Sequence, residues 1–200
     1  MTRGGRLLRA LLLPAALAAA PGAEARAQDN RAVANVTASV TVVAPPIQFI
    51  NSRTLEFGPV GPGQTVSVPA REPWPSAATW SGAFRFFNLR KQVDYAVSFT
   101  LPAALQRGAA SIPVSFAGTQ YGWACIWSTS AATCNAYGAA FSPAAHASPA
   151  TAIVIDLPNS SPGNNFIGDF FVGGVITVPG APLPPGTYTA PITITLAPVN

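Results

Sequence analysis

Charged residues are scarce in this chain, making up 9% of its 200 residues, against about 25% in an average soluble domain. Cysteine and histidine are scarcer still, with two residues and one. A tetrahedral zinc site takes four ligands, most of them Cys or His, and the chain lacks such a set. We therefore expect no metal ion and no cofactor.

Long apolar runs are also missing beyond the N-terminal region, so no segment there is expected to span a bilayer, which takes about 20 apolar residues. Residues 1–27 instead have the three parts of a secretory signal peptide. Arginines at positions 3, 6 and 9 come first, an apolar stretch follows from Ala10 to Ala20, and Ala25-Arg26-Ala27 forms the cleavage motif. The alternative, a membrane anchor, is interrupted by Pro21 and by the charges after it.

Positive charge is lacking once this segment is removed. Four of the 11 basic residues and one of the 7 acidic residues lie within residues 1–27, which leaves a net charge of +1. Nucleic-acid binding depends on clustered positive charge, so we expect no nucleic-acid partner. The sequence predicts a secreted protein of the periplasm or the extracellular cell surface.

The two cysteines, Cys125 and Cys134, lie close together in a chain that is expected to enter an oxidising compartment. We expect a disulfide between them. Closing a loop of this length restricts the unfolded chain by about 2.5–3 kcal/mol in the chain-entropy model. Two free thiols, or half of a metal site, are the alternatives.

Alternation of apolar and polar residues is what the chain does have, at both ends. A period of two is typical of a β-strand with one buried face. The apolar positions are Val36, Ala38, Val40 and Val42 near the start, and Tyr188, Ala190, Ile192, Ile194 and Leu196 near the end. Pro191 lies within the last of these segments and has no N–H to donate, which favours an edge strand or a bulge.

Similar patterns recur along the chain, with Gly and Pro between them and no helical periodicity of useful length. Residues 93–101 give the clearest interior strand, residues 166–178 a strand with a bulge at Gly173-Gly174, and residues 135–149 an Ala-rich loop. We count eight or nine strands. The sequence predicts an all-β protein, an antiparallel β-sandwich formed by one domain over residues 28–200, with a closed barrel as the alternative.

The order of several short motifs resembles a bacterial family of secreted, uncharacterised domains, similar in type to fimbrial and spore-coat-U-like pilus subunits. The motifs are Leu55-Glu56-Phe57-Gly58, Gly63-Gln64-Thr65-Val66, Val172-Gly173-Gly174-Val175-Ile176-Thr177-Val178 and Pro185-Gly186-Thr187-Tyr188. The resemblance implies an immunoglobulin-like sandwich that is exported and assembled at the cell surface, with an assembly chaperone in the periplasm as a further partner. The segment from Cys125 to Cys134 has no place in that pattern.

We therefore expect a non-enzymatic structural subunit that pairs with itself or with related subunits by β-strand addition. Residues 36–42 would be the donor, and residues 188–196 would offer the edge. Low charge removes the repulsion that keeps such edges apart. The alternative is intramolecular, with both terminal strands completing the same sandwich in a monomer.

A second hypothesis is a carbohydrate- or surface-binding module. Trp123 and Trp127 flank Cys125 on an expected hairpin, and exposed aromatic rings suit a glycan. Packing of the two rings against the disulfide and the end of the sandwich is the alternative.

Catalytic groups are sparse and scattered. His146 lies in the Ala-rich segment, without a G-x-S-x-G motif or another nucleophile setting, and we expect it to be a solvated loop residue. A carboxylate pair for glycoside hydrolysis is a further alternative. Asp156 and Asp169, with asparagines between them, could hold calcium, but they lack the spacing of a calcium loop, and we expect polar turn residues instead.

Overall fold

The computed structural model describes residues 31–40, 47–70, 81–128, 134–157 and 165–199, with residues 31–40 and 50–52 as backbone only. The expected signal peptide, Val42, and the asparagines at 159 and 164 lie outside these residues.

The described residues form fourteen strands and three short 3₁₀ turns. The strands are β1 (Arg31–Val40), β2 (Gln48–Arg53), β3 (Leu55–Pro59), β4 (Thr65–Val68), β5 (Gly82–Arg90), β6 (Asp94–Thr100), β7 (Ala104–Arg107), β8 (Ala110–Ser115), β9 (Gly122–Ser128), β10 (Tyr137–Phe141), β11 (Ile153–Ile155), β12 (Asn165–Val172), β13 (Gly174–Thr177) and β14 (Tyr188–Val199). The turns are η1 (Thr119–Tyr121), η2 (Pro143–His146) and η3 (Pro149–Thr151). The predicted all-β fold is confirmed, with more and shorter strands than the eight or nine expected.

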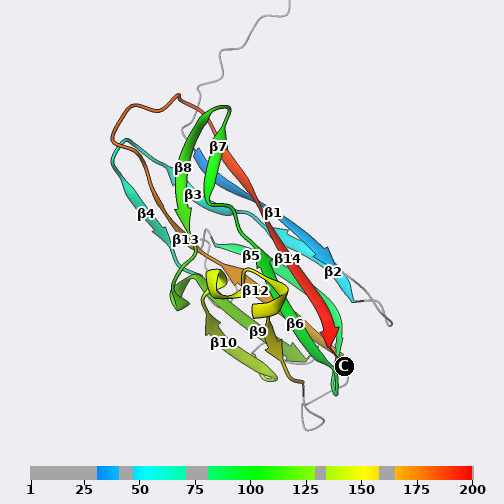
Figure 1. Cartoon of the computed structure of the whole chain (residues 1–200). Helices are drawn as coiled ribbons and strands as arrows, with labels where there is room; N and C mark the ends of the chain where they lie inside the picture. The colour runs from blue at the N-terminus through cyan, green and yellow to red at the C-terminus, as the bar shows by residue number, and fades with distance from the viewer. Residues whose placement is uncertain (1–30, 41–46, 71–80, 129–133, 158–164, 200) are drawn as a thin grey trace, which may run out of the picture.

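Two sheets stack to form the sandwich (Figure 1). Within the described part of the chain, the larger sheet has nine strands. Seven follow the order β11-β6-β14-β7-β8-β13-β4, β1 joins them by pairing with β14, and β3 joins by pairing with β1. The smaller sheet has five strands, in the order β10-β9-β12-β5-β2.

The core lies between the inner faces of the two sheets. β14 buries Ile192, Ile194 and Leu196 completely, at 0% exposed, and β5 and β12 supply Phe84 and Phe170 from the opposite sheet. Burying each such side chain contributes about 1.5–3 kcal/mol. The period-two pattern of the last strand therefore predicted its buried face correctly.

The expected bulge at Gly173-Gly174 is instead a crossing between the sheets. β12 ends at Val172 in the smaller sheet, and β13 begins at Gly174 in the larger one. A Cβ on Gly173 would lie 2.6 Å from the nitrogen of Ala70, and the Gly173 N–H donates to the carbonyl of Tyr121 over 2.8 Å. Only glycine fits a crossing this close to the neighbouring backbone.

The prediction that β14 is an edge strand is wrong. β14 pairs with β1 along one side and with β7 and then β6 along the other. On that second side the register passes from Thr189 opposite Gln106 in β7 to Thr193 opposite Thr100 in β6. Pro191 falls between these pairs, so its missing N–H coincides with a break in the ladder.

The expected loop at residues 135–149 is wrong in part. β10 lies within it and pairs antiparallel with β9, from Tyr137 opposite Ile126 to Phe141 opposite Gly122. Phe141 is buried and stacks on Phe99, with 5.4 Å between the ring centroids. Alanine is a weak strand former, so the pairing with β9 and the anchor at Phe141 determine this strand.

Candidate functional site

The first strand of the described chain, β1, lies beside the last strand, β14 (Figure 1). The register runs in parallel through nine residue pairs, from Ala32 opposite Tyr188 to Val40 opposite Leu196. Because the polypeptide enters the sheet at β1 and leaves it at β14, the two ends of the described chain meet in one ladder.

β1 also carries β3. These two strands pair antiparallel, from Arg31 opposite Pro59 to Ala34 opposite Leu55, with an irregularity after Ala32. Among the described strands, β3 has no ladder partner other than β1. Taking β1 away would therefore leave one side of β14 unpaired and would detach β3 from the sheet.

The β1–β14 ladder is parallel, whereas the other ladders between described strands are antiparallel. Parallel pairing is slightly less stable per residue than antiparallel pairing. β1 therefore runs parallel to β14, whereas the other paired strands run antiparallel to each other.

The sequence-predicted assembly residues come together in this ladder. Val36 is opposite Ile192, Ala38 is opposite Ile194, and Val40 is opposite Leu196. The segments expected to act as donor and edge therefore pair with each other within one chain. This is the intramolecular arrangement considered as the alternative.

The expected disulfide is present. Cys125 in β9 and Cys134, before β10, are bonded across a separation of nine residues. Asn135 reinforces this link, because its Oδ1 accepts the backbone N–H of Ser128 at 2.9 Å and its Nδ2 donates to the Ser128 hydroxyl at 3.1 Å. The hairpin is therefore tied by both covalent and hydrogen bonds at the end where β9 connects to β10.

Trp127 lies on the outer face of the smaller sheet in a fully engaged cluster. Asp169 in β12 is buried, and its two oxygens accept Arg85 Nε at 2.6 Å, Arg85 Nη2 at 2.9 Å and Trp127 Nε1 at 3.1 Å. The Arg85 guanidinium also lies over the Trp127 ring, 5.6 Å from its centroid. The hydrogen bond to Asp169 and the charge of that carboxylate raise the pKa of Arg85, outweighing the effect of its partial burial. The indole is held by its own sheet, so its N–H is already used.

Trp123 lies four residues before Trp127 on the same strand, opposite Phe171 of β12. Its Nε1 is buried and has no hydrogen-bond partner among the described residues. Phe171 and Ile167 are themselves buried, at 3% and 5% exposed. The two tryptophans thus share one face, as expected, and this face is packed. Trp74 and Trp80 lie outside the described residues.

The sequence analysis missed the Arg85–Asp169 pair. Asp169 was considered only as a calcium ligand or a turn residue, and here it is an ion-paired residue in the middle of a strand. The available signal was positional, because Arg85 lies between two phenylalanines and Asp169 precedes two more. A single charged residue that alternates with buried aromatic residues indicates the outer face of a strand.

His146 is half-buried in η2, not in an open loop. Its Nδ1 hydrogen-bonds to the carbonyl oxygen of Thr151 at 2.6 Å, and its ring meets Phe141 edge-on. The described residues contain no group of three or more His, Cys, Asp or Glu side chains placed to hold a metal ion. In the same described part of the chain, no helix is long and apolar enough to cross a membrane.

The disulfide fits an exported protein, since such bonds persist in oxidising compartments. Comparison of the chain with protein-family models and with curated proteins found no match.

Proposed function

We propose that this protein is a non-enzymatic structural subunit, exported to the periplasm or the cell surface, that associates by β-strand addition through β1. The observation that carries the proposal is the position of β1. It is inserted between β14 and β3, and it joins two strands that have no ladder with each other.

The site between β14 and β3 that holds β1, called here the seat of β1, binds a strand through backbone hydrogen bonds. β14 offers nine residue positions to β1, and β3 offers the opposite edge. A second copy presents an identical β1, so exchange between copies would preserve every register pair at the cost of association entropy. Domain swapping of an identical element is a common route from monomer to oligomer.

Composition supports association by backbone pairing. With a net charge of +1 outside residues 1–27 and few charges overall, neither edge of the seat would be protected by repulsion between copies. An unpaired β14 edge would therefore pair with a strand from a neighbouring copy.

Cross-linking of mixed cysteine variants tests the exchange. Ala34 lies opposite Ala190 in the β1–β14 ladder. A chain carrying Ala34→Cys is mixed with a chain carrying Ala190→Cys, and the mixture is oxidised under native conditions. Strand exchange places the two new thiols side by side across chains, so a disulfide-linked heterodimer should form.

A matched pair controls for random collisions. Thr65 of β4 lies opposite Thr177 of β13, and both are exposed. Mixing Thr65→Cys with Thr177→Cys should give only background cross-linking, because this ladder does not include β1. If the Ala34/Ala190 mixture forms no more heterodimer than this control after prolonged incubation, β1 stays in its own chain and the assembly proposal is overturned.

The tryptophan face gains no comparable support as a glycan site. Trp127 is occupied by Asp169 and Arg85, and the indole N–H of Trp123 is buried. A stacking platform for a sugar needs an open ring face.

A further inference from the structure

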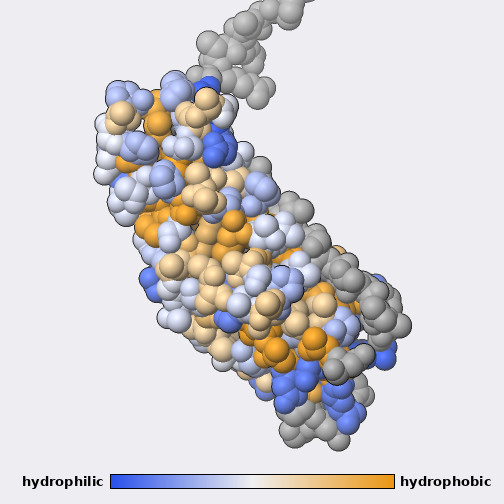
Figure 2. Space-filling view, in the orientation of Figure 1, coloured by the Kyte–Doolittle hydropathy of each residue, from blue (hydrophilic) through white to orange (hydrophobic). Residues whose placement is uncertain are grey.

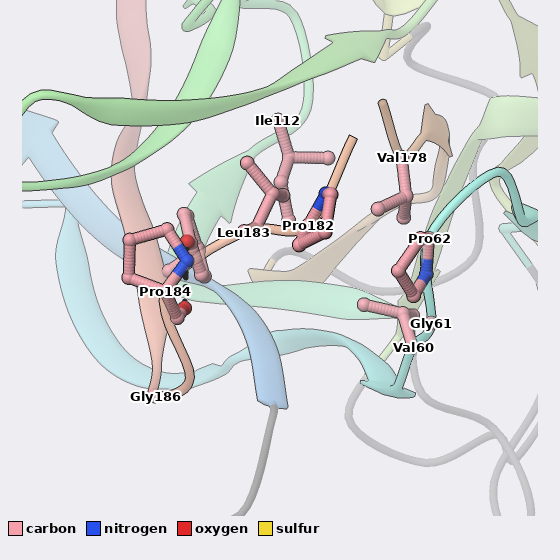
Figure 3. A pocket seen from close by; sticks show the side chains of 10 residues that line it. Val60, Gly61, Pro62, Ile112, Val178, Pro182, Leu183, Pro184 and Gly186 are labelled. Atoms are coloured by element: carbon pink, nitrogen blue, oxygen red, sulfur yellow. Dashed lines mark hydrogen bonds between the residues drawn. The ribbon is translucent and has the colours of Figure 1, made fainter. Parts of the chain in front are cut away.

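An apolar pocket opens at the end of the sandwich where β14 begins (Figure 3). Its volume is about 100 Å³. The side chains around it are almost all aliphatic or proline, from the turn after β3, the end of β13, the segment before β14, and β8. The lining residues are Val60, Gly61, Pro62, Ile112, Val178, Pro182, Leu183, Pro184, Gly186 and Tyr188. A cavity of about 150 Å³ takes a benzene molecule, so this one has room for a single small aliphatic side chain.

A positive charge lies at the edge of this pocket. A Cβ on Gly186, a lining residue, would fall 3.0 Å from Cζ of Arg107. The Arg107 side chain forms no ion pair with another described residue. The Tyr188 hydroxyl donates a hydrogen bond to the carbonyl of Pro184 at 2.8 Å, and both residues line the pocket. The site therefore combines an apolar cavity with a cation at its edge.

The opposite end of β14 carries protruding apolar side chains beside negative charges. Val154 of β11 is 59% exposed and Val199 of β14 is 40% exposed, and these are two of the three large exposed apolar side chains among the described residues. Val199 of β14 is opposite Asp94 of β6, and Val154, on the other side of β6, is opposite Ala96, two residues further along that strand. Asp94 is exposed, and so is Asp156, which follows β11. Two aliphatic side chains therefore stand beside two carboxylates.

These two surfaces cannot meet within one molecule. β14 separates them with 12 residues, which span roughly 35–40 Å at about 3.3 Å per residue. Figure 1 shows β14 running from the end with the β7–β8 hairpin to the C-terminus at the other end, and Figure 2 shows apolar surface at both ends. Complementary patches at opposite ends of one molecule make a head-to-tail contact that repeats without closing.

We propose that the pocket binds the Val154/Val199 end of a second copy, giving an open head-to-tail row. Val154 or Val199 of one copy enters the pocket of the next copy. Arg107 beside that pocket then faces Asp94 and Asp156 of the first copy. Arg90, the last residue of β5, and Lys91, in the turn before Asp94, carry the same sign of charge as Arg107 and weaken this attraction. No residue of β1 lines either surface, and strand exchange would preserve the β1 pairing of Tyr188 and of β3 beside the pocket, so the end contact does not require exchange.

The heterologous geometry gives a decisive mixing experiment. Val154→Asp disables one end of the protein, and Leu183→Glu disables the other. In sedimentation velocity, every chain carries an Ala34→Cys/Ala190→Cys disulfide that holds β1 in its own molecule, so strand exchange does not contribute. Wild type at the two ends should then form concentration-dependent oligomers, and each variant alone should stay monomeric. An equimolar mixture of the two should form 1:1 dimers and nothing larger, because a single competent contact remains.

Charge reversal protects this result against a folding defect in Leu183→Glu. Arg107→Glu lies on the surface and should also weaken the association, and mixing it with Asp94→Arg should restore open-row oligomers, because opposite charges then face each other at both contacts between the two chains. If wild type stays monomeric at high concentration, or if the variants and the mixture sediment like wild type, the head-to-tail contact is overturned. Cross-linking between Ala34→Cys and Ala190→Cys chains reads strand exchange separately, so the two proposals can fail independently.

Discussion

Removing the charge of Arg85 should destabilise the protein more than removing the charge of Asp169, although the two form one ion pair. The reason is their unequal exposure, 27% for the Arg85 side chain and 7% for that of Asp169. Arg85→Met leaves the Asp169 carboxylate away from water and still accepting a hydrogen bond from the Trp127 indole N–H. Asp169→Asn leaves a guanidinium that water can reach and keeps an amide oxygen as acceptor.

The magnitudes follow from these environments. Removing one partner of a buried ion pair costs about 3–5 kcal/mol, and because Arg85 is partly exposed we take the lower end, about 3 kcal/mol. Asp169→Asn loses charge from its hydrogen bonds but keeps an acceptor, which costs about 1–2 kcal/mol. For a protein of this size, 1 kcal/mol lowers the melting temperature by roughly 2–4 °C, so we expect losses of roughly 6–12 °C and 2–8 °C.

Urea unfolding at pH 7, with the disulfide intact and followed by circular dichroism, measures both free energies. The double variant Arg85→Met/Asp169→Leu, which removes both charges, should be more stable than Arg85→Met alone, because no buried charge is left unpaired. If Arg85→Met lies within about 0.5 kcal/mol of wild type, or if Asp169→Asn is the more damaging change, the asymmetry argument is wrong.

Three further changes test other parts of the fold. Gly173→Ala should cost at least about 3 kcal/mol in urea unfolding, since its Cβ would overlap the backbone at residues 68–70, whereas Gly180→Ala, whose Cβ meets nothing within 4 Å, should be nearly neutral. Replacing Cys125 and Cys134 together by Ser should lower the free energy of unfolding by about 2.5–3 kcal/mol, and an unchanged midpoint would contradict this. Burial raises the pKa of Tyr137, so its neutral form stabilises the fold below about pH 10, and this stability is lost as the pH rises further. Tyr137→Phe should reduce the loss of stability above about pH 10 in alkaline unfolding, and a profile identical to that of wild type would refute this role of Tyr137.

The buried faces of strands could be predicted from the sequence, and their edges could not. Tyr188, Ile192 and Leu196 alternate with polar residues because one face of β14 meets the core. Nothing comparable marks which strands lie to either side, since backbone hydrogen bonds do not depend on the side chain. Pro191 was the single edge signal, and it reports a local break between β7 and β6 and not a free edge.

The candidate sites divide in the same way. Cys125 and Cys134 could be paired from the sequence because they are the only cysteines and lie close together. Arg85 and Asp169 are 84 residues apart, and their pairing depends on β5 and β12 being neighbours at that register. Side-chain pairs of this kind follow from strand order, and strand order comes from the packing of the whole chain.

The pairing of β1 with β14 and β3 protects strand edges that the low charge of the protein leaves without repulsion. While β1 is seated, both edges of the seat are covered, and a weakly charged sheet is protected by pairing and not by repulsion. When β1 leaves, β14 and β3 are exposed together, because β3 has no other ladder partner among the described strands. The ladder that must open is also the parallel one, the weaker kind per residue. Ten residues near the start of the described chain therefore determine whether the sandwich is closed or open to a strand from another copy.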